Sequence, residues 1–316
     1  MQSKYESMQL PESHHTEKGI YVEIGISSSI RELWDKTQVP ELHRKWDLRF
    51  TDINYLPHPN LSEPQQFLYT TRMGFGMSIS GRGETKGTQE TDGSKTSALK
   101  FWSDDPKSLI RAGSGYWRYI PTQNGFRFLT WYDYSTRFGA PGRTIDAIVF
   151  RPLIGWATAW SFDRLRLWIE KQIDPATSML QSIVYGICRL TVAFVWIYQG
   201  LVPKLLSGSA DEGAMLADAG WRSDFIPTAV RCAGIAEIAF GVLLILAWRS
   251  RSFLAITAGL MLVALMFVGM ESPRYLSAAF NPVTLNLSMV SFSVIGLLCG
   301  KDLPSASRCL RRKGSG

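Results

Sequence analysis

The sequence predicts two domains of different kinds: an α+β helix-grip domain, followed by an all-α bundle of four transmembrane helices. Charged residues are concentrated in the first half, with 41 in residues 1–172 against 20 in residues 173–316. The first half consists mainly of short apolar-alternating runs separated by turn residues, which is typical of antiparallel strands. The second half contains four long apolar runs.

Four segments follow from this division. Residues 1–18 are polar and contain no apolar run, so we expect a disordered leader and no secretory signal. Residues 19–173 form the helix-grip domain, and residues 174–302 form the membrane bundle. Residues 303–316 are expected to be a basic cytoplasmic tail.

The helix-grip domain is predicted from the order of its elements. Alternation over residues 20–26 indicates a half-buried strand, and the following serines are suited to capping a short helix that ends before Pro40. A long helix is expected over residues 144–173, with a kink at Pro152. Between these helices the pattern predicts six strands, at residues 48–56, 65–73, 77–85, 97–102, 115–120 and 125–134.

The membrane bundle is predicted from segments long enough to cross the hydrocarbon core of a bilayer, which takes about 20 residues. Apolar helices also occur in the cores of soluble proteins, but four in succession favour a membrane. The predicted spans are residues 183–202, 228–247, 253–270 and 283–300.

Flanking charges predict the topology. Arg249 and Arg251 lie between the second and third spans, and a basic cluster that includes Arg311 and Arg312 follows the fourth. Lys and Arg favour the cytoplasmic side. The loop after the first span is mostly acidic, so we expect it outside. Both chain ends are then cytoplasmic, and the bundle is expected in the cell (inner) membrane. The bilayer, rather than nucleic acid, is the expected partner of the basic tail.

Neither a metal site nor a reaction is indicated by the sequence. Four cysteines (Cys188, Cys232, Cys299 and Cys309) form no C-x-x-C motif and lie near no histidine, so a zinc site and a disulfide framework are not expected. We identify no catalytic motif, and whether the chain is an enzyme stays open.

A polar site is predicted inside the bundle. Arg189 and Glu237 lie within the first and second spans, where ionisable side chains are costly and normally find a partner. We expect them to pair, either as a binding or proton-handling site or as a structural ion pair; snorkelling of Arg189 is a further alternative. An outward-facing polar pocket is expected from Lys204, Glu212, Arg231 and Asn286. Snorkelling of Arg231 and packing by Asn286 are the alternatives.

Aromatic residues on neighbouring strands and on the long helix predict either an aromatic core or the wall of a cavity for an apolar ligand. The candidate lining residues are Trp102, Trp117, Phe128, Trp131, Trp156 and Trp160. Asp47 is expected to cap a turn rather than act as an acid or base, and His43 is expected to have a structural role.

Three segments, residues 128–134, 150–166 and 198–204, resemble bacterial DoxX-like membrane proteins, including those fused to an N-terminal START-like (SRPBCC) domain. The resemblance covers roughly residues 19–299. It implies a START-like domain that binds an apolar ligand between sheet and long helix. It also implies quinone-linked chemistry, known among some DoxX relatives, with quinone as the possible cofactor.

Three functions are compatible with the sequence. The first is a protein whose cytoplasmic START-like domain binds a lipid or quinone-like molecule and presents it to the bundle. The second is the membrane component of a quinone-linked oxidoreductase, which rests on the resemblance alone. The third is a non-catalytic scaffold, with another membrane protein or a second copy as partner.

Overall fold

The computed structural model describes residues 19–57, 63–74, 76–91, 93–208, 210–279 and 281–313, so the expected leader at residues 1–18 lies outside it. The chain folds into two compact units. One comprises the chain up to Ala176 together with the residues from Pro304 onward, and the other comprises Thr177–Leu303.

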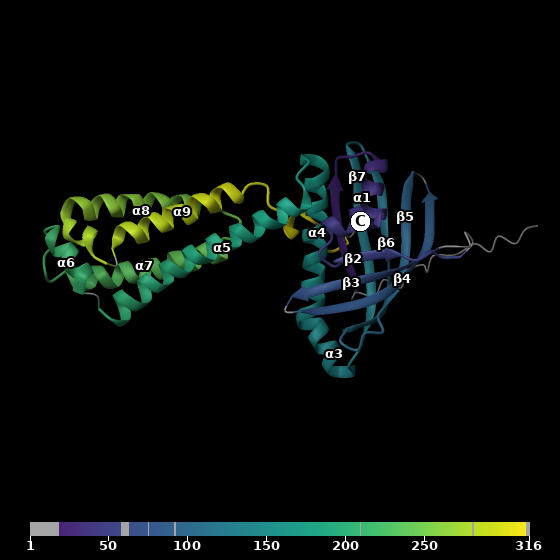
Figure 1. Cartoon of the computed structure of the whole chain (residues 1–316), viewed down its shortest axis with the longest axis horizontal. Coiled ribbons are helices and arrows are strands. Elements are labelled where there is room, and N and C mark those ends of the chain that lie inside the picture. The colour runs from purple at the N-terminus through teal and green to yellow at the C-terminus, as the bar shows by residue number, and fades with distance from the viewer. Residues whose placement is uncertain are drawn as a thin grey trace, which may run out of the picture. The chain divides into compact units, whose positions relative to one another are not determined.

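The N-terminal unit contains one antiparallel sheet of seven strands in the order β1-β7-β6-β5-β4-β3-β2 (Figure 1). This confirms the predicted antiparallel strands, although β4 and β6 are longer than expected. The strands are β1 (Ile20–Ile26), β2 (Asp52–Tyr55), β3 (Gln66–Gly74), β4 (Met77–Thr91), β5 (Ser94–Trp102), β6 (Ile110–Thr122) and β7 (Gly125–Thr136).

Up to Lys171, the described part of this unit also contains five helical segments: α1 (Ile30–Gln38), α2 (Pro40–Trp46), α3 (Gly139–Ile145), the π-helical turn η1 (Asp146–Phe150) and α4 (Arg151–Lys171). Ser29 caps α1, because its hydroxyl accepts a hydrogen bond from the backbone N–H of Glu32 at 3.2 Å. Pro152 lies in the first turn of α4, where its missing N–H is tolerated. The predicted long helix therefore contains a π-helical turn, η1, directly before α4.

α4 packs against the inner face of the sheet and gives the unit its helix-grip fold (Figure 1). The rings of Phe128 on β7 and Phe162 on α4 stack with centroids 4.5 Å apart. Trp46 at the end of α2 is fully buried against Phe162. The predicted fold class is confirmed for this unit.

The second unit contains four helices long enough and apolar enough to cross a membrane: residues 175–206, 226–246, 252–271 and 282–299. These are α5 (Pro175–Gln199) with the π-helical turn η2 (Gly200–Leu206), α7 (Ile226–Leu246), α8 (Ser252–Glu271) and α9 (Pro282–Cys299). The short helices α6 (Ala210–Asp218) and η3 (Pro273–Ser277) lie in the connecting segments. The predicted four-helix bundle is confirmed.

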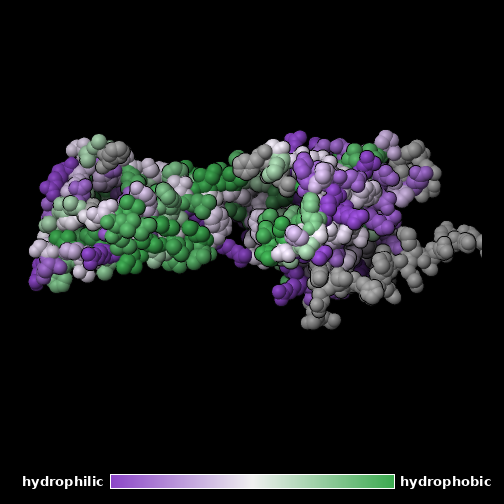
Figure 2. Space-filling model, turned by 90° about the horizontal axis from the view of Figure 1, so that it is seen from below, coloured by the Kyte–Doolittle hydropathy of each residue, from purple (hydrophilic) through white to green (hydrophobic). Residues whose placement is uncertain are grey.

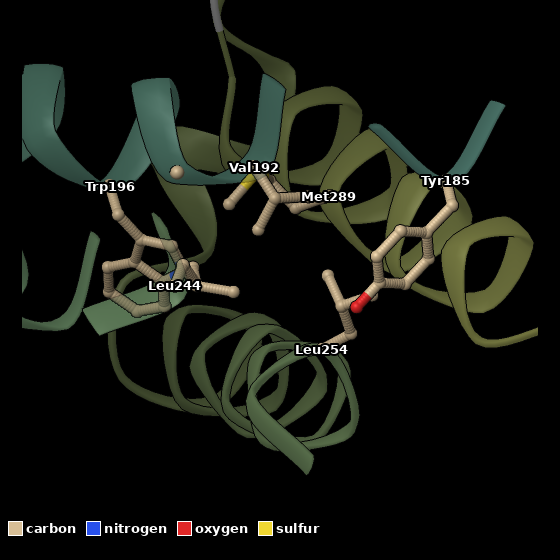
Figure 3. Close-up of a cluster of buried hydrophobic side chains, with 7 residues drawn as sticks. Tyr185, Val192, Trp196, Leu244, Leu254 and Met289 are labelled. Atoms are coloured by element: carbon tan, nitrogen blue, oxygen red, sulfur yellow. The ribbon is translucent and has the colours of Figure 1, made fainter. Parts of the chain in front are cut away.

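The bundle buries a small core and exposes many apolar side chains. Figure 3 shows the core, to which all four long helices contribute: Tyr185, Val192, Trp196, Leu244, Leu254 and Met289. Phe194 and Met266 are 63% and 66% exposed, and Figure 2 shows apolar residues covering much of the visible bundle surface. Such a surface suits a lipid environment, where helices satisfy their own backbone hydrogen bonds.

The C-terminal residues, expected as a basic cytoplasmic tail, belong to the same compact unit as the N-terminal domain. Residues 304–313, here called the C-terminal strap, include the short helix η4 (Ala306–Arg308) and pack on α4. Leu310 forms an antiparallel bridge with Glu23 of β1. The basic composition of this segment predicted contact with lipid. In the structure the segment has specific partners in the N-terminal unit: the open edge of β1 and the buried carboxylate of Asp163 on α4.

Candidate functional site

A cavity of about 300 Å³ lies between the inner face of the sheet and the first turns of α4. Alternate residues of β5 line it, namely Ser97, Leu99 and Phe101, because successive side chains of a strand point to opposite faces. Leu153 and Ile154 close it from α4. The volume is at the lower end of the range typical of small-molecule sites.

Glycines on the inner face help to keep this space open. A Cβ atom at Gly83 would lie 2.2 Å from the ring of Phe67, and one at Gly115 would lie 2.5 Å from the Cβ of Tyr132. Neither position accepts a side chain without displacing its neighbour. The ring of Phe67 on β3 therefore lies over Gly83 of β4, and β7 approaches β6 closely at Gly115.

The cavity reaches the protein surface at the start of α4, since Leu153 both lines it and is 57% exposed. Four further apolar side chains on the same stretch of chain are more than half exposed: Phe138, Ile145, Ile148 and Val149. We call these five residues the apolar rim. Figure 2, in which the molecule is seen from below relative to Figure 1, shows an apolar patch at the α3 end of this unit.

One wall of the cavity carries a buried ion pair. Asp47 is 1% exposed, and the guanidinium of Arg49 donates to both of its carboxylate oxygens, from Nε at 2.9 Å to Oδ1 and from Nη2 at 2.6 Å to Oδ2. His43 Nε2 lies 3.0 Å from Asp47 Oδ2. Arg49 and His43 line the cavity, and Arg49 also lies over the ring of Tyr132.

The electrostatics of this trio follow from burial and mutual contact. Burial alone would raise the pKa of Asp47, but the charge of Arg49 and the hydrogen bonds from His43 and Arg49 outweigh it and hold that pKa well below its usual range. Burial lowers the pKa of His43 despite the opposing effect of Asp47. At neutral pH the wall therefore holds one anion, one cation and a neutral imidazole.

This arrangement gives the cavity an apolar body and one polar end. Nε and Nη2 of Arg49 are held by Asp47, and Nη1 is the guanidinium nitrogen that is not committed to that carboxylate. A guanidinium donates only, so it selects an acceptor such as a carbonyl, hydroxyl or carboxylate oxygen. The fixed ion pair leaves the wall without net charge and allows a neutral ligand.

Of the six aromatic residues predicted to line a cavity, Trp117 does so. Phe128 belongs to the packed core, and Trp131 stacks on Tyr116 with centroids 6.2 Å apart. The other three lie outside the lining: Trp102 follows the lining residue Phe101 on the strand, and Trp156 and Trp160 stack on each other along α4.

These errors have a common cause. The strand pattern shows which residues alternate but not which face becomes the cavity, and Trp131 lies between the lining residues Thr130 and Tyr132. The expected capping of a turn by Asp47 is confirmed, because its Oδ1 accepts a hydrogen bond from the backbone N–H of Arg49 at 3.0 Å. The sequence did not place Asp47 and His43 beside a cavity. The signal present in the sequence was an acid and a base two residues apart, Asp47 and Arg49, with His43 one helical turn before them.

In the bundle, the predicted pair of Arg189 and Glu237 is wrong. Arg189 is fully buried and donates to three backbone carbonyls that end α7 and begin the next loop: Leu244 at 2.6 Å, Ala247 at 2.6 Å and Ser250 at 2.8 Å. It also donates to the hydroxyl of Tyr185 at 2.5 Å.

The reason lies in the geometry of a helix end. The last carbonyls of a helix have no intrahelical donors and carry partial negative charge. They therefore offer Arg189 acceptors at its own depth. Glu237 lies seven residues before Leu244, about 10 Å further along α7.

Glu237 pairs instead with Lys204 of η2, whose Nζ lies 2.9 Å from Glu237 Oε2 and 2.7 Å from Glu212 Oε1. The backbones approach closely here, because a Cβ at Gly200 would lie 2.4 Å from the carbonyl oxygen of Gly234. One lysine thus lies between two carboxylates, at a π-helical turn of a kind often found at functional sites.

The remaining predicted bundle residues do not join this polar cluster of Lys204, Glu212 and Glu237. Arg231 is exposed, and among the described residues it has no ion pair or hydrogen bond. Asn286 is 8% exposed on the buried face of α9, next in that row to Met289. The predicted outward-facing pocket of four residues is reduced to the contact between Lys204 and Glu212.

Comparison with known proteins shows the family of this chain. Residues 193–294 match the model of the DoxX-like family. An uncharacterized membrane protein of Bacillus subtilis (strain 168), YndG, is 48% identical over 202 residues, which cover 62% of this chain and 75% of that protein. The chain belongs to the DoxX-like family of membrane proteins. The predicted membrane location of this family member is thereby confirmed.

Solved structures resemble this DoxX-like protein at low sequence identity. A hypothetical protein from Helicobacter pylori is 16% identical, with a TM-score of 0.40, and the match covers 54% of this chain and 100% of that one. A STAR-related lipid transfer protein fragment from Xanthomonas axonopodis is 14% identical, with a TM-score of 0.37, over 48% of this chain and 85% of that one.

Proposed function

We propose that this membrane protein binds an apolar molecule with one polar acceptor group in its N-terminal domain, and that it presents this molecule to the bundle and the bilayer. The observation that carries the proposal is the cavity, which is largely apolar and has the Asp47–Arg49 pair on its wall. Sites of this composition bind small apolar molecules and orient them through few polar contacts. Lipids and quinone-like molecules both belong to this class.

The apolar rim supports exchange with a bilayer rather than with water. Exposed apolar side chains that cluster beside a cavity opening are unfavourable in water and favourable at a lipid interface. Ile148, the most exposed of them, is 71% exposed. A ligand that leaves the cavity past Leu153 meets this surface first.

Site-resolved photolabelling tests the binding proposal. The full chain in nanodiscs is incubated with palmitic acid that carries a diazirine, then irradiated, and the labelled peptides are mapped by mass spectrometry. We expect label on β5 and on the first turns of α4, and competition by unlabelled palmitate. Label confined to the membrane spans would count against the proposal.

Two neighbouring residues of β5 give matched variants. Leu99 lines the cavity, whereas Ala98 is absent from its lining and has the opposite orientation on the strand. Leu99→Trp should fill the space and abolish cavity labelling, whereas Ala98→Trp should leave it intact. Equal labelling of the two variants would place the bound probe elsewhere.

For the topology, we propose that both the N-terminal domain and the C-terminal strap are cytoplasmic, in the inner membrane. The strap belongs to the same compact unit as the N-terminal domain. The chain must therefore return to its starting side, which an even number of spans achieves, and the basic loop at Arg249 and Arg251 favours the cytoplasm. Arg312→Cys should react with a membrane-impermeant maleimide in inverted vesicles and stay unlabelled in intact cells; the reverse pattern would overturn this topology.

A further inference from the structure

The C-terminal strap runs antiparallel to α4 across about three helical turns. Near one end, Ser305 and Arg308 contact Asp163. Further along, the thiol of Cys309 donates to the carbonyl of Ala159 at 3.2 Å, and Arg311 donates to the carbonyl of Pro152 at 3.3 Å. The strap therefore lies in the groove that α4 forms with the edge strand β1.

The anchor of the strap is the buried carboxylate of Asp163, which is 0% exposed. It accepts hydrogen bonds from Arg166 Nε at 2.8 Å, from the backbone N–H of Ser305 at 2.7 Å and from Arg308 Nη1 at 2.9 Å. Two of these three donors come from the strap. Charge-assisted bonds of this length are the strong ones, so docking of the strap satisfies a charge that α4 otherwise buries with one donor.

The strap also closes the free edge of the sheet. The backbone N–H and C=O of Leu310 bond to those of Glu23 at 2.9 Å each. Cys309 is buried, whereas the side chain of Leu310 is 61% exposed. The strap is thus held by backbone groups and one carboxylate, and its docking also buries Ala306 and Cys309.

The far end of the strap reaches the part of α4 that forms the cavity wall. Arg311 contacts Pro152 and lies 3.2 Å from where a Cβ at Gly155 would be. Leu153 and Ile154, between these two residues, line the cavity. At its other end the strap follows α9, which ends at Cys299, after four intervening residues.

We infer that the C-terminal strap is a releasable latch: docked, it holds the first turns of α4 over the cavity, and released, it lets them open. Because the strap continues from α9, a displacement of that helix is transmitted to the cavity wall. The effect on ligand exchange rests on the proposed binding function, whereas the effect on α4 does not.

Cys309 provides a direct reporter of docking. Its thiol is buried under the docked strap, and burial raises its pKa to about 12, which slows its reaction with maleimide further. In the full chain in nanodiscs, Arg308→Ala should label about tenfold faster at Cys309, the factor expected when one charge-assisted hydrogen bond is lost from the docked state. Arg312→Ala removes the same charge at an exposed position. Arg312 has no hydrogen bond or ion pair in the described part of the chain, so this variant should label as slowly as wild type.

Hydrogen exchange in the same two variants tests the coupling to α4. Arg308→Ala should speed amide exchange at residues 153–160 and in β1 but leave α7 unchanged, and bound diazirine palmitate should dissociate faster. Faster Cys309 labelling without faster exchange in α4 would overturn the latch, as would equal effects of the two variants.

If α4 loosens but probe dissociation does not change, the strap does not gate the cavity. Failure of the probe to label the cavity in any variant would sink the binding function instead, and the exchange data alone would then decide the latch.

Discussion

Arg49 in the N-terminal domain and Arg189 in the bundle are both largely removed from solvent, yet their partners differ in kind. Arg49 is neutralised by a carboxylate, Asp47, at the wall of a cavity. Arg189 bonds to three backbone carbonyls and one tyrosine hydroxyl at a helix end. The first arrangement places a cation on the wall of a cavity, whereas the second uses the guanidinium to complete the backbone hydrogen bonding of a neighbouring helix.

This difference separates a site from a structural brace. A guanidinium whose donors are committed to three backbone carbonyls and one tyrosine hydroxyl has little capacity left for a ligand. A charge paired beside an apolar cavity still faces a space that a ligand can enter. For Arg189 we therefore propose a structural role. Glu237 pairs with Lys204 instead of with Arg189.

The largest effect is expected from Asp47→Asn, which leaves the charge of Arg49 buried without its partner. Breaking one side of a buried ion pair costs about 3–5 kcal/mol of unfolding free energy. We expect a lower unfolding midpoint of the N-terminal domain, followed by tryptophan fluorescence of the full chain in detergent. Asp52→Asn, which removes an exposed carboxylate that faces Arg44, should change this midpoint little. Equal effects of the two substitutions would contradict the assignment of Asp47 as a buried counter-ion.

The comparison predicts a smaller loss for Arg189→Leu. This change leaves the carbonyls at the end of α7 without a donor, at about 1–3 kcal/mol. We expect the helical circular dichroism signal of the bundle to be lost at a lower temperature, while the N-terminal domain keeps its stability. Arg189→Lys should recover part of the loss, because a lysine also donates hydrogen bonds. The recovery should be incomplete, because its donors lack the planar geometry of a guanidinium. A selective loss of palmitate labelling in the cavity would contradict a purely structural role.

A double-mutant cycle sharpens the reassignment of Glu237. Lys204→Met and Glu237→Gln should show a coupling of about 1 kcal/mol, because the two side chains are in direct contact. The matched cycle of Arg189→Leu with Glu237→Gln should show none, since the two residues share no partner. Coupling in the second cycle but not in the first would restore the original pairing.

The smallest effect is a pH dependence at the cavity wall. The pKa of His43 is lowered in the folded domain, so the unfolded chain binds a proton first as the pH falls, and stability is lost below about pH 6.5. The lowered pKa of Asp47 adds a loss of the same sign below its ordinary range. We expect less than about 1 kcal/mol between pH 6.5 and 5.5, absent in His43→Gln. Greater stability of the wild-type domain at lower pH would show that His43 is protonated against Asp47.

The fold was predictable from the sequence because its signals are local. Alternation in the strands, serine capping at Ser29 and four apolar runs each depend on residues close together in the chain. The DoxX-like resemblance added the family, which the comparisons support. Strand ends were less accurate, because β4 continues past a shift in register at Gly87, where φ is +121°.

The site was less predictable because it depends on which distant residues meet. Trp117 and Trp131 are similar in sequence context, but the cavity forms on one face of the sheet only. The docking of the strap on Asp163 joins positions more than 140 residues apart. Its basic residues were interpreted by their charge alone, which does not distinguish lipid contact from a buried acceptor.

The most direct test of the cavity as a ligand site is native mass spectrometry of the full chain released from detergent. We expect wild type and Ala98→Trp to retain a bound small-molecule mass, and Leu99→Trp, with its cavity filled, to retain none. The same retained mass in Leu99→Trp, or no retained mass in wild type after exposure to palmitate, would contradict it.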